Sequence, residues 1–319
     1  MGQVENAPRR GSMQIWPRKR AKRMVARVRT FYGNPKETKP LAFLGYKAGM
    51  SHAQVRDNNP NSTSKSQIIS IPVTIIECPP IKPYSIRFYK RSNSLGLQVT
   101  SEIYSEKLDK QFKNKNSGNI PETFDDVRIV MYTDPRKTGL SRKNPDIFEM
   151  SMSGKDAKEK LAKGQELLKK DFIYISEIFN EGQLLDVHAV SKGKGMQGSV
   201  KRFGVKIRQH KSEKTKRGPG TLGPWTPKRV MAGRIPHAGK MGYHQRTEYN
   251  KLLVKIVKPE DVNQKGGIKH YGNVLNEAVL IKGSVPGPAK RPIILTAPQR
   301  PHKKPEVYEL VKVSTESKQ

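Results

Sequence analysis

Residues 68–76 read IISIPVTII, and the turn-like ECPP follows at positions 77–80. A short apolar run that ends in turn residues is typical of a β-strand. Six further runs of this kind occur, at residues 41–46, 127–132, 184–190, 252–257, 274–281 and 293–295. Turn residues separate several of these runs, as in NEG at 180–182 and KGS at 282–284. The sequence therefore predicts a mainly β fold with a barrel or a sandwich at its core.

Two helices are predicted among these strands. The first covers residues 100–112, where apolar side chains recur at every fourth position. The second follows the cap-like SGKD at 153–156 and carries Leu161 and Leu168 on one face. Both lie in a quarter of the chain, residues 101–180, whose fifteen basic and fourteen acidic side chains nearly balance. This quarter is expected to be an inserted α/β portion with an ordinary folded surface.

The remaining charge is strongly positive and unevenly distributed. The 319 residues carry a net charge of +33, and only 34% of them are apolar. Residues 1–40 hold eleven basic side chains against two acids, and residues 191–250 hold fifteen against two, with ten glycines and four prolines. Such segments bury too little apolar surface to offset their ordering entropy, so we expect them to take their shape from a polyanion. As a hairpin, residues 200–250 would reach at most about 80 Å.

Several other classes of protein do not fit the sequence. No run of about 18 apolar residues is present, and the basic amino terminus lacks the apolar region of a signal peptide. The opening Met1-Gly2 suggests myristoylation, but Asn6 stands where that signal needs Ser or Thr. The single cysteine, Cys78, is interpreted as a small buried residue in a reducing cytoplasm. Nucleic acid is thus the expected polyanion.

A glycine-rich loop invites an enzymatic interpretation. Residues 193–198, GKGMQG, match both the dinucleotide fingerprint and the kinase glycine loop. The basic, glycine-broken KRFGVK that follows at 201–206 does not continue a dinucleotide fold, and no kinase catalytic motif occurs. The seven histidines show no metal-ligand spacing beside carboxylates. No catalytic residue, cofactor or metal is therefore expected, and a nucleotide-dependent enzyme using Gly193–Gly198 remains the alternative.

The basic segments contain the residue types that RNA binding requires. Lysine and arginine neutralise phosphates, glycine lets the backbone approach closely, and proline stiffens extended chain. Both tryptophans, Trp16 and Trp225, lie in these segments, and proline flanks Trp225 on both sides. We expect both rings to stack on bases or riboses. No helix-turn-helix, zinc finger or aromatic RNP motif is visible, which disfavours sequence-specific DNA reading.

Four blocks of the sequence resemble one family, the universal large-subunit ribosomal protein L-three in its archaeal and eukaryotic form. They are APRRGS with PRKR at 7–12 and 17–20, LAFLGYKAGMSH at 41–52, DVHAVSKGKGMQGSVKR at 186–202, and GKMGYHQRT at 239–247. The third block resembles the signature of the family, and the fourth resembles its return arm. Together they span nearly the whole chain.

The resemblance implies a translation-factor-like β-barrel core with an extended N-terminal tail and a long central finger, all bound to large-subunit rRNA. It also implies a cytoplasmic place in the large ribosomal subunit, early assembly, and a finger tip at Trp225 near the peptidyl-transferase centre. The implied protein neighbours are L-fourteen and L-twenty-four-e. Length and tail favour an archaeal origin. Eukaryotic members carry histidine where this chain has Lys216, so no role of that histidine is transferred.

The resulting map places a basic N-terminal extension at 1–40, the first part of the barrel core at 41–99, the α/β insertion at 100–180, a core strand and the signature loop at 181–200, the basic finger at 201–250, the remainder of the core at 251–297 and a C-terminal tail at 298–319. The predicted RNA-binding residues are Trp16, Arg18, Lys19, Arg20, Lys22, Arg23, Lys192, Lys194, Lys201, Arg202, Lys206, Arg208, His210, Lys216, Arg217, Trp225, Lys228, Arg229, Arg234, His237, Lys240, His244 and Arg246.

A transient RNA chaperone or translation factor is a further alternative, which would leave a ribosome in a mild salt wash.

Overall fold

The computed structural model describes residues 11, 13, 15–33, 37–109, 112, 118–231, 233–302 and 306–316. The chain divides into two compact units. Unit 1 consists of residues 1–22 and 191–245, and unit 2 consists of residues 23–190 and 246–319. Block 7–12 of the family resemblance, except for Gly11, lies outside the described residues. Strands dominate the described chain, which confirms the prediction of a mainly β fold.

The strands are β1 (Ala42–Asp57), β2 (Ile68–Glu77), β3 (Ile81–Ser92), β4 (Gly96–Tyr104), β5 (Asp126–Thr133), β6 (Asp146–Ser151), β7 (Leu184–Val190), β8 (Met196–Gln197), β9 (Gly239–Lys240), β10 (Gln245–Val257), β11 (Ala278–Lys282), β12 (Pro292–Thr296) and β13 (Tyr308–Val313). The α-helices are α1 (Ala157–Lys169) and α2 (Ser199–Phe203), and short 3-10 turns cover Pro135–Lys137, Ile175–Glu177 and Pro259–Asp261.

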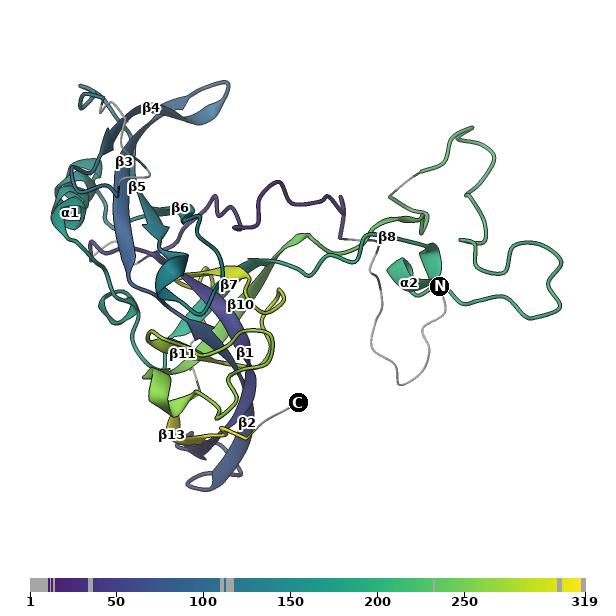
Figure 1. Ribbon diagram of the computed structural model, residues 1–319. Coiled ribbons are helices and arrows are strands. Elements are labelled where there is room, and N and C mark those ends of the chain that lie inside the picture. The colour runs from purple at the N-terminus through teal and green to yellow at the C-terminus, as the bar shows by residue number, and fades with distance from the viewer. Residues whose placement is uncertain are drawn as a thin grey trace. The chain divides into compact units, whose positions relative to one another are not determined.

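Six strands close into a barrel in the order β12-β7-β10-β11-β2-β1, because β1 also pairs with β12 (Figure 1). The long strand β1 pairs with two strands along the edge that is not paired with β2: residues 42–46 pair with β12, and residues 53–57 pair with β13. A bulge at 47–49 lies between these two stretches and gives the strand the bend that both partners need. The barrel strands are rich in buried apolar residues, and Phe43, Leu185 and Val279 are fully buried.

A second, antiparallel sheet in unit 2 has the order β4-β3-β5-β6 (Figure 1). Helix α1 covers one of its faces, and a Cβ added at Gly164 of α1 would lie 3.3 Å from Ile86 of β3 and from Met152. The predicted helix after residue 153 is therefore confirmed as α1. The predicted helix over 100–112 is wrong, because residues 96–104 pair with β3 as strand β4.

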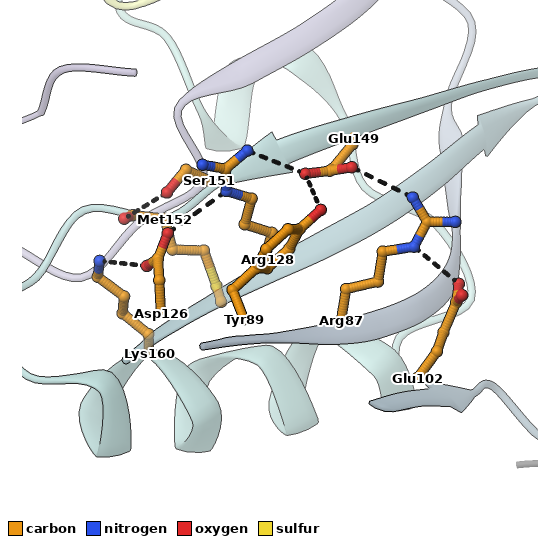
Figure 2. Close-up of polar contacts among 9 residues, drawn as sticks. All are labelled: Arg87, Tyr89, Glu102, Asp126, Arg128, Glu149, Ser151, Met152 and Lys160. Atoms are coloured by element: carbon orange, nitrogen blue, oxygen red, sulfur yellow. Dashed lines mark hydrogen bonds and ion pairs between the residues drawn. The ribbon is translucent and has the colours of Figure 1, made fainter. Parts of the chain in front are cut away.

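The other face of this sheet carries a charged network, which Figure 2 shows in close-up. Arg87 contacts Glu102 at 3.2 Å and Glu149 at 3.2 Å, and Arg128 contacts Glu149 at 3.0 Å. Burial opposes the charge of Arg128, but the hydrogen bond and charge of Glu149 outweigh it and raise the pKa of Arg128. Glu102 and Glu149 are thus neutralised by cations of the same unit.

Buried polar residues tie the barrel strands to their loops. Glu77, at the end of β2, accepts hydrogen bonds from Tyr271 Oη, from the amides of Leu275 and Asn276 at 2.9 and 3.0 Å, and from Asn276 Nδ2 at 2.8 Å. These contacts hold residues 274–276 as a loop. The strand predicted over 274–281 therefore begins only at Ala278.

The described part of the C-terminal tail also joins the core. Residues 308–313, which the sequence assigns to that tail, form β13 and pair with β1. The other predicted strands are confirmed, and β7 has the expected bounds of 184–190. No helix in the described part of the chain is long and apolar enough to cross a membrane.

Candidate nucleic-acid interface

The frame of unit 1 is a two-stranded ribbon. Its two arms, residues 191–197 and 239–244, pair through β8 and β9. Beyond that pairing, the amide of Lys194 donates to the carbonyl of Met241, and the amide of Met241 donates to the carbonyl of Gly195, both at 2.9 Å. Gly242 has a φ of +74°, and a Cβ there would lie 2.0 Å from the carbonyl oxygen of Lys192. Only glycine fits this position of the ribbon.

The N-terminal segment joins the ribbon as a third length of chain. The amide of Ala21 donates to the carbonyl of Tyr243 at 2.8 Å. On the next residue of the ribbon, His244 Nδ1 lies 2.6 Å from the carbonyl oxygen of Lys19. A carbonyl oxygen only accepts, so Nδ1 of His244 carries the hydrogen. These contacts bring the basic residues 18–20 and 22 beside the ribbon that carries the glycine-rich loop, an arrangement that the sequence does not reveal.

Arg202 closes the base of the long loop between the two ribbon arms. Its guanidinium donates from Nε to the carbonyl of Lys240 at 3.1 Å and from Nη1 to the carbonyl of His237 at 2.9 Å. The ring of Phe203 lies beneath both Arg202 and Arg18, at 5.1 and 4.2 Å from their guanidinium carbons. Burial lowers the pKa of Arg202. Arg202 thus fastens the protein backbone, and its geometry favours a structural role over a phosphate contact.

Most of the predicted RNA-binding residues are exposed. They are Trp16, Lys19, Arg20, Lys22, Arg23, Lys192, Lys194, Lys201, Lys206, Arg208, His210, Lys216, Arg217, Trp225, Lys228, Arg229, Arg234 and Lys240. Arg18, His237 and Arg246 are half-buried, and Arg202 and His244 are buried. Arg23 and Arg246 belong to unit 2, and the other predicted residues belong to unit 1.

The charge of unit 1 has almost no internal counterpart. Its described residues, 11, 13, 15–22, 191–231 and 233–245, contain eighteen lysines and arginines but only one carboxylate, that of Glu213. Unit 2 differs, because its acids form ion pairs such as those in Figure 2. Unneutralised cations at this density repel one another unless an external polyanion lies among them.

The two tryptophans stand in different surroundings within unit 1. Trp225 is 90% exposed, in a turn that the amide of Lys228 closes on its carbonyl at 3.0 Å. Trp16 is 49% exposed, and its ring lies against Gly233, where an added Cβ would stand 3.8 Å from the indole. A large aromatic ring that leaves half or more of its surface in water is available to stack on a base.

The sequence prediction missed one surface of unit 1. Arg20, Lys240 and Tyr243 line a shallow hollow together with the glycines of the ribbon. The guanidinium of Arg20 lies 5.6 Å from the centre of the Tyr243 ring. Tyr243 has a φ of +54°, a region that bulky side chains rarely adopt. The position of Tyr243 between Lys240 and Arg246 is a signal of RNA binding that the sequence contains. The proximity of Arg20 to Tyr243 is visible only in the fold.

The enzymatic alternative finds little support in this geometry. A helix does begin directly after Gly198, but α2 ends after five residues, where Gly204 adopts a φ of +67°. The preceding strand β7 runs antiparallel to β12, whereas a dinucleotide site needs a parallel sheet. Cys78 is buried, and burial raises the pKa of its thiol, which leaves it unreactive. No group of side chains suited to hold a metal occurs among the described residues.

The basic side chains and exposed aromatic rings of unit 1 have the composition that is typical of proteins associated with nucleic acids. Comparison with known proteins specifies the family. The family model described as Ribosomal protein L3 matches residues 1–123 and 116–319. The chain therefore belongs to the ribosomal protein L3 family, the family that the four sequence blocks resemble, and it is a structural constituent of the ribosome.

Its relatives match over almost their entire length. The chain is similar to the Large ribosomal subunit protein uL3 of Methanocaldococcus jannaschii, with 43% identity over 100% of this chain and 99% of the relative. The protein of the same name from Methanococcus aeolicus is 41% identical over the same shares of both chains. That of Methanobrevibacter smithii is 40% identical over 98% of each. All three are archaeal, which confirms the archaeal type inferred from the sequence.

Proposed function

We propose that the protein binds large-subunit rRNA through unit 1, supports early assembly of that subunit, and extends Trp225 toward the peptidyl-transferase centre. In this proposal the basic extension at 1–40 and the basic finger at 201–250 penetrate folded RNA. The barrel stays outside as an anchor. The protein performs no chemistry itself and supports peptide-bond formation by stabilising the RNA around it.

One observation carries the proposal: the described part of unit 1 holds eighteen basic side chains against Glu213 alone. Binding to phosphates relieves the repulsion among these cations and releases the counterions that RNA condenses. If unit 1 and the RNA become ordered together, the protein must bind before the surrounding RNA has finished folding. This supports a role in early assembly.

The proposed finger tip rests on the exposure of Trp225 and on the charges that follow it. The exposed cations Lys228 and Arg229 lie within four residues of the ring, and Pro224 and Pro227 stiffen the same turn. Stacking by the ring and phosphate contacts by the cations would fix the turn in a crowded RNA interior. Large-subunit proteins L-fourteen and L-twenty-four-e are the proposed neighbours of the anchor, as the family resemblance implies.

The salt dependence of RNA binding tests this proposal. The full chain is titrated with a transcript of archaeal large-subunit rRNA between about 50 and 500 mM salt, and the logarithm of the binding constant is plotted against that of salt concentration. Replacing Lys206 and Arg208 of unit 1 by glutamine is expected to reduce the slope by about 2, since each lost phosphate contact removes roughly 0.9.

The matched control replaces Lys155 and Lys158, two exposed lysines beside and on α1 in unit 2, by glutamine. This control removes the same net charge, so the slope should change little if unit 1 makes the contacts. Equal slopes for the two double variants would overturn the proposal. A salt wash of assembled subunits separates a resident protein, which only high salt removes, from a transient factor, which leaves in a mild wash.

A further inference from the structure

We propose that the hollow beside Tyr243 is a preformed seat for the sugar-phosphate backbone of RNA, in which the bare peptide at Gly193 touches the ribose and Arg20 and Lys240 hold the adjoining phosphates. This inference rests on the proposed function and specifies it. It assigns an RNA contact to Gly193 and makes the hollow beside Tyr243 the place of that contact.

The glycines of the ribbon differ in the reason why the position needs glycine. Gly195 has a φ of +67°, and Gly242 combines a φ of +74° with a clash at 2.0 Å, so the fold of the protein itself excludes side chains at both positions. Gly193 has neither feature. Its φ lies outside the left-handed region, and an added Cβ would meet only the Tyr243 side chain, at the ordinary contact distances of 3.6 and 3.9 Å.

Gly193 is therefore a position where the protein alone would accept alanine, although it lines the hollow and is exposed. Glycine at an unstrained, exposed position permits another backbone to approach closely. Because the described residues of unit 1 line the hollow without filling it, we assign the approaching backbone to a ligand. A methyl group at Gly193 would push that ligand away without disturbing the ribbon.

The charges around the hollow identify the chemistry of the ligand. Arg20 and Lys240 are exposed and come from two different segments, the N-terminal chain and β9. Tyr243 holds the guanidinium of Arg20 beside the hollow through a cation-π contact at 5.6 Å. Two exposed cations that line the same hollow as a bare peptide suit a ligand that repeats anions at short intervals along a chain. A nucleic-acid backbone has this property.

The hydrogen bonds of the ribbon explain why the seat is preformed. The amides of Lys194 and Met241 are both engaged across the ribbon, and the amide of Ala21 is engaged by Tyr243. The three segments that line the hollow are therefore held together before any ligand arrives. Preorganisation of this kind lowers the entropic cost of binding.

The experiment measures binding of the full chain to the large-subunit rRNA transcript at constant salt. Gly193→Ala is expected to weaken binding about tenfold, which corresponds to about 1.4 kcal/mol. The matched control is Gly266→Ala in unit 2, where the φ is also unstrained and an added Cβ meets nothing within 4 Å. Its affinity should stay within about twofold of the parent, as befits a surface substitution away from the contact. Arg20→Gln and Lys240→Gln should each reduce the salt slope by about 1.

Hydrogen exchange of the free protein accompanies the binding measurement. If the seat is real, Gly193→Ala leaves the exchange rates of the Lys194 and Met241 amides unchanged while the affinity falls. Faster exchange at those amides would mean that Gly193 is a structural glycine, and the inference would be overturned. Parent-like affinity of Gly193→Ala overturns the seat but leaves RNA binding by unit 1 intact. Failure of the parent protein to bind RNA would sink both.

Discussion

His244 Nδ1 lies 2.6 Å from the carbonyl oxygen of Lys19 and fastens together two segments that are 225 residues apart. Because the imidazole is buried, water cannot readily replace this hydrogen bond. We expect His244→Ala to release the N-terminal segment from the ribbon. The amide of Ala21, which donates to Tyr243, should then exchange about tenfold faster, as the loss of roughly 1.4 kcal/mol implies.

The exposed His210 supplies the control for this prediction. His210→Ala should leave the exchange of the Ala21 amide unchanged. If His244→Ala also leaves it unchanged, the imidazole does not hold the tail.

Arg202 and Lys201 are adjacent on α2 and are expected to act in opposite ways. Arg202→Ala leaves the carbonyls of His237 and Lys240 without their charged donor, which costs about 1.5–3 kcal/mol for such a bond. Amides near residues 237–241 should exchange faster in this variant. Lys201→Ala should leave exchange unchanged and reduce the salt slope of RNA binding by about 1. The reverse assignment of effects would contradict the structural role of Arg202.

Trp225→Ala should leave the fold intact, because the ring is 90% exposed and contributes little to the core. We expect the free energy of unfolding to change by less than about 0.5 kcal/mol. In ribosomes, the same substitution should alter tRNA selection or sensitivity to drugs that bind the peptidyl-transferase centre. A large loss of thermal stability would show instead that the ring packs within the protein.

His188 should make the stability of unit 2 depend on pH. Its ring lies between the hydroxyls of Thr247 and Thr296, at 2.9 and 3.0 Å, and burial lowers its pKa although Asp186 acts in the opposite direction. The unfolded chain titrates near the ordinary value of about 6.5. As the pH falls below that value, the unfolded state binds a proton that the folded state does not, so stability is lost on the acid side and is fully present above it.

Denaturant midpoints between about pH 7.5 and pH 5.5 measure this effect, since the window spans the ordinary histidine pKa. His188→Gln should flatten the pH dependence over this interval, whereas His302→Gln, at an exposed position, should not. An unchanged profile for His188→Gln would show that another group causes the acid loss.

The barrel strands could be predicted because their apolar runs are short and continuous. Strand β7 has the predicted bounds, and β2 extends only one residue beyond the prediction. Strand β13 was not predicted, although residues 308–313, YELVKV, alternate in part between apolar and charged side chains. The sequence assigns them to the C-terminal tail, and their pairing with β1 makes them a strand. Tertiary pairing, which a local pattern does not contain, decides such cases.

The false helix over 100–112 shows how a real signal can indicate the wrong conformation. Tyr104, Leu108 and Phe112 do gather, around Tyr84 and Tyr132 of the second sheet. Tyr104 ends strand β4, and the other two follow in the segment after it. The apolar spacing thus reports a shared cluster rather than a helical face.

The sequence could predict which residue types make up the candidate site, but not which of these side chains are buried and which are exposed. Charge alone selects Arg202 and His244 as RNA contacts, yet both are buried and bonded to backbone carbonyls. Charge also passes over Tyr243 and Gly193, which line the hollow. Long-range backbone pairing decides which cations face outward, and one sequence does not reveal that pairing.

Residues 205–231 and 233–236 form the loops that follow α2 in Figure 1 and contain no helix or strand. Their described backbone hydrogen bonds outside regular elements are mostly turns, such as Lys228 to Trp225. If phosphates complete this conformation, their amides should exchange rapidly in the free protein and slowly in the complex with large-subunit rRNA.

Hydrogen exchange of residues 205–236, measured with and without the rRNA transcript, decides whether RNA orders this segment. We expect strong protection of the segment on binding, while the barrel strands exchange at the same slow rate in both states. Equal protection of the segment with and without RNA would contradict this expectation.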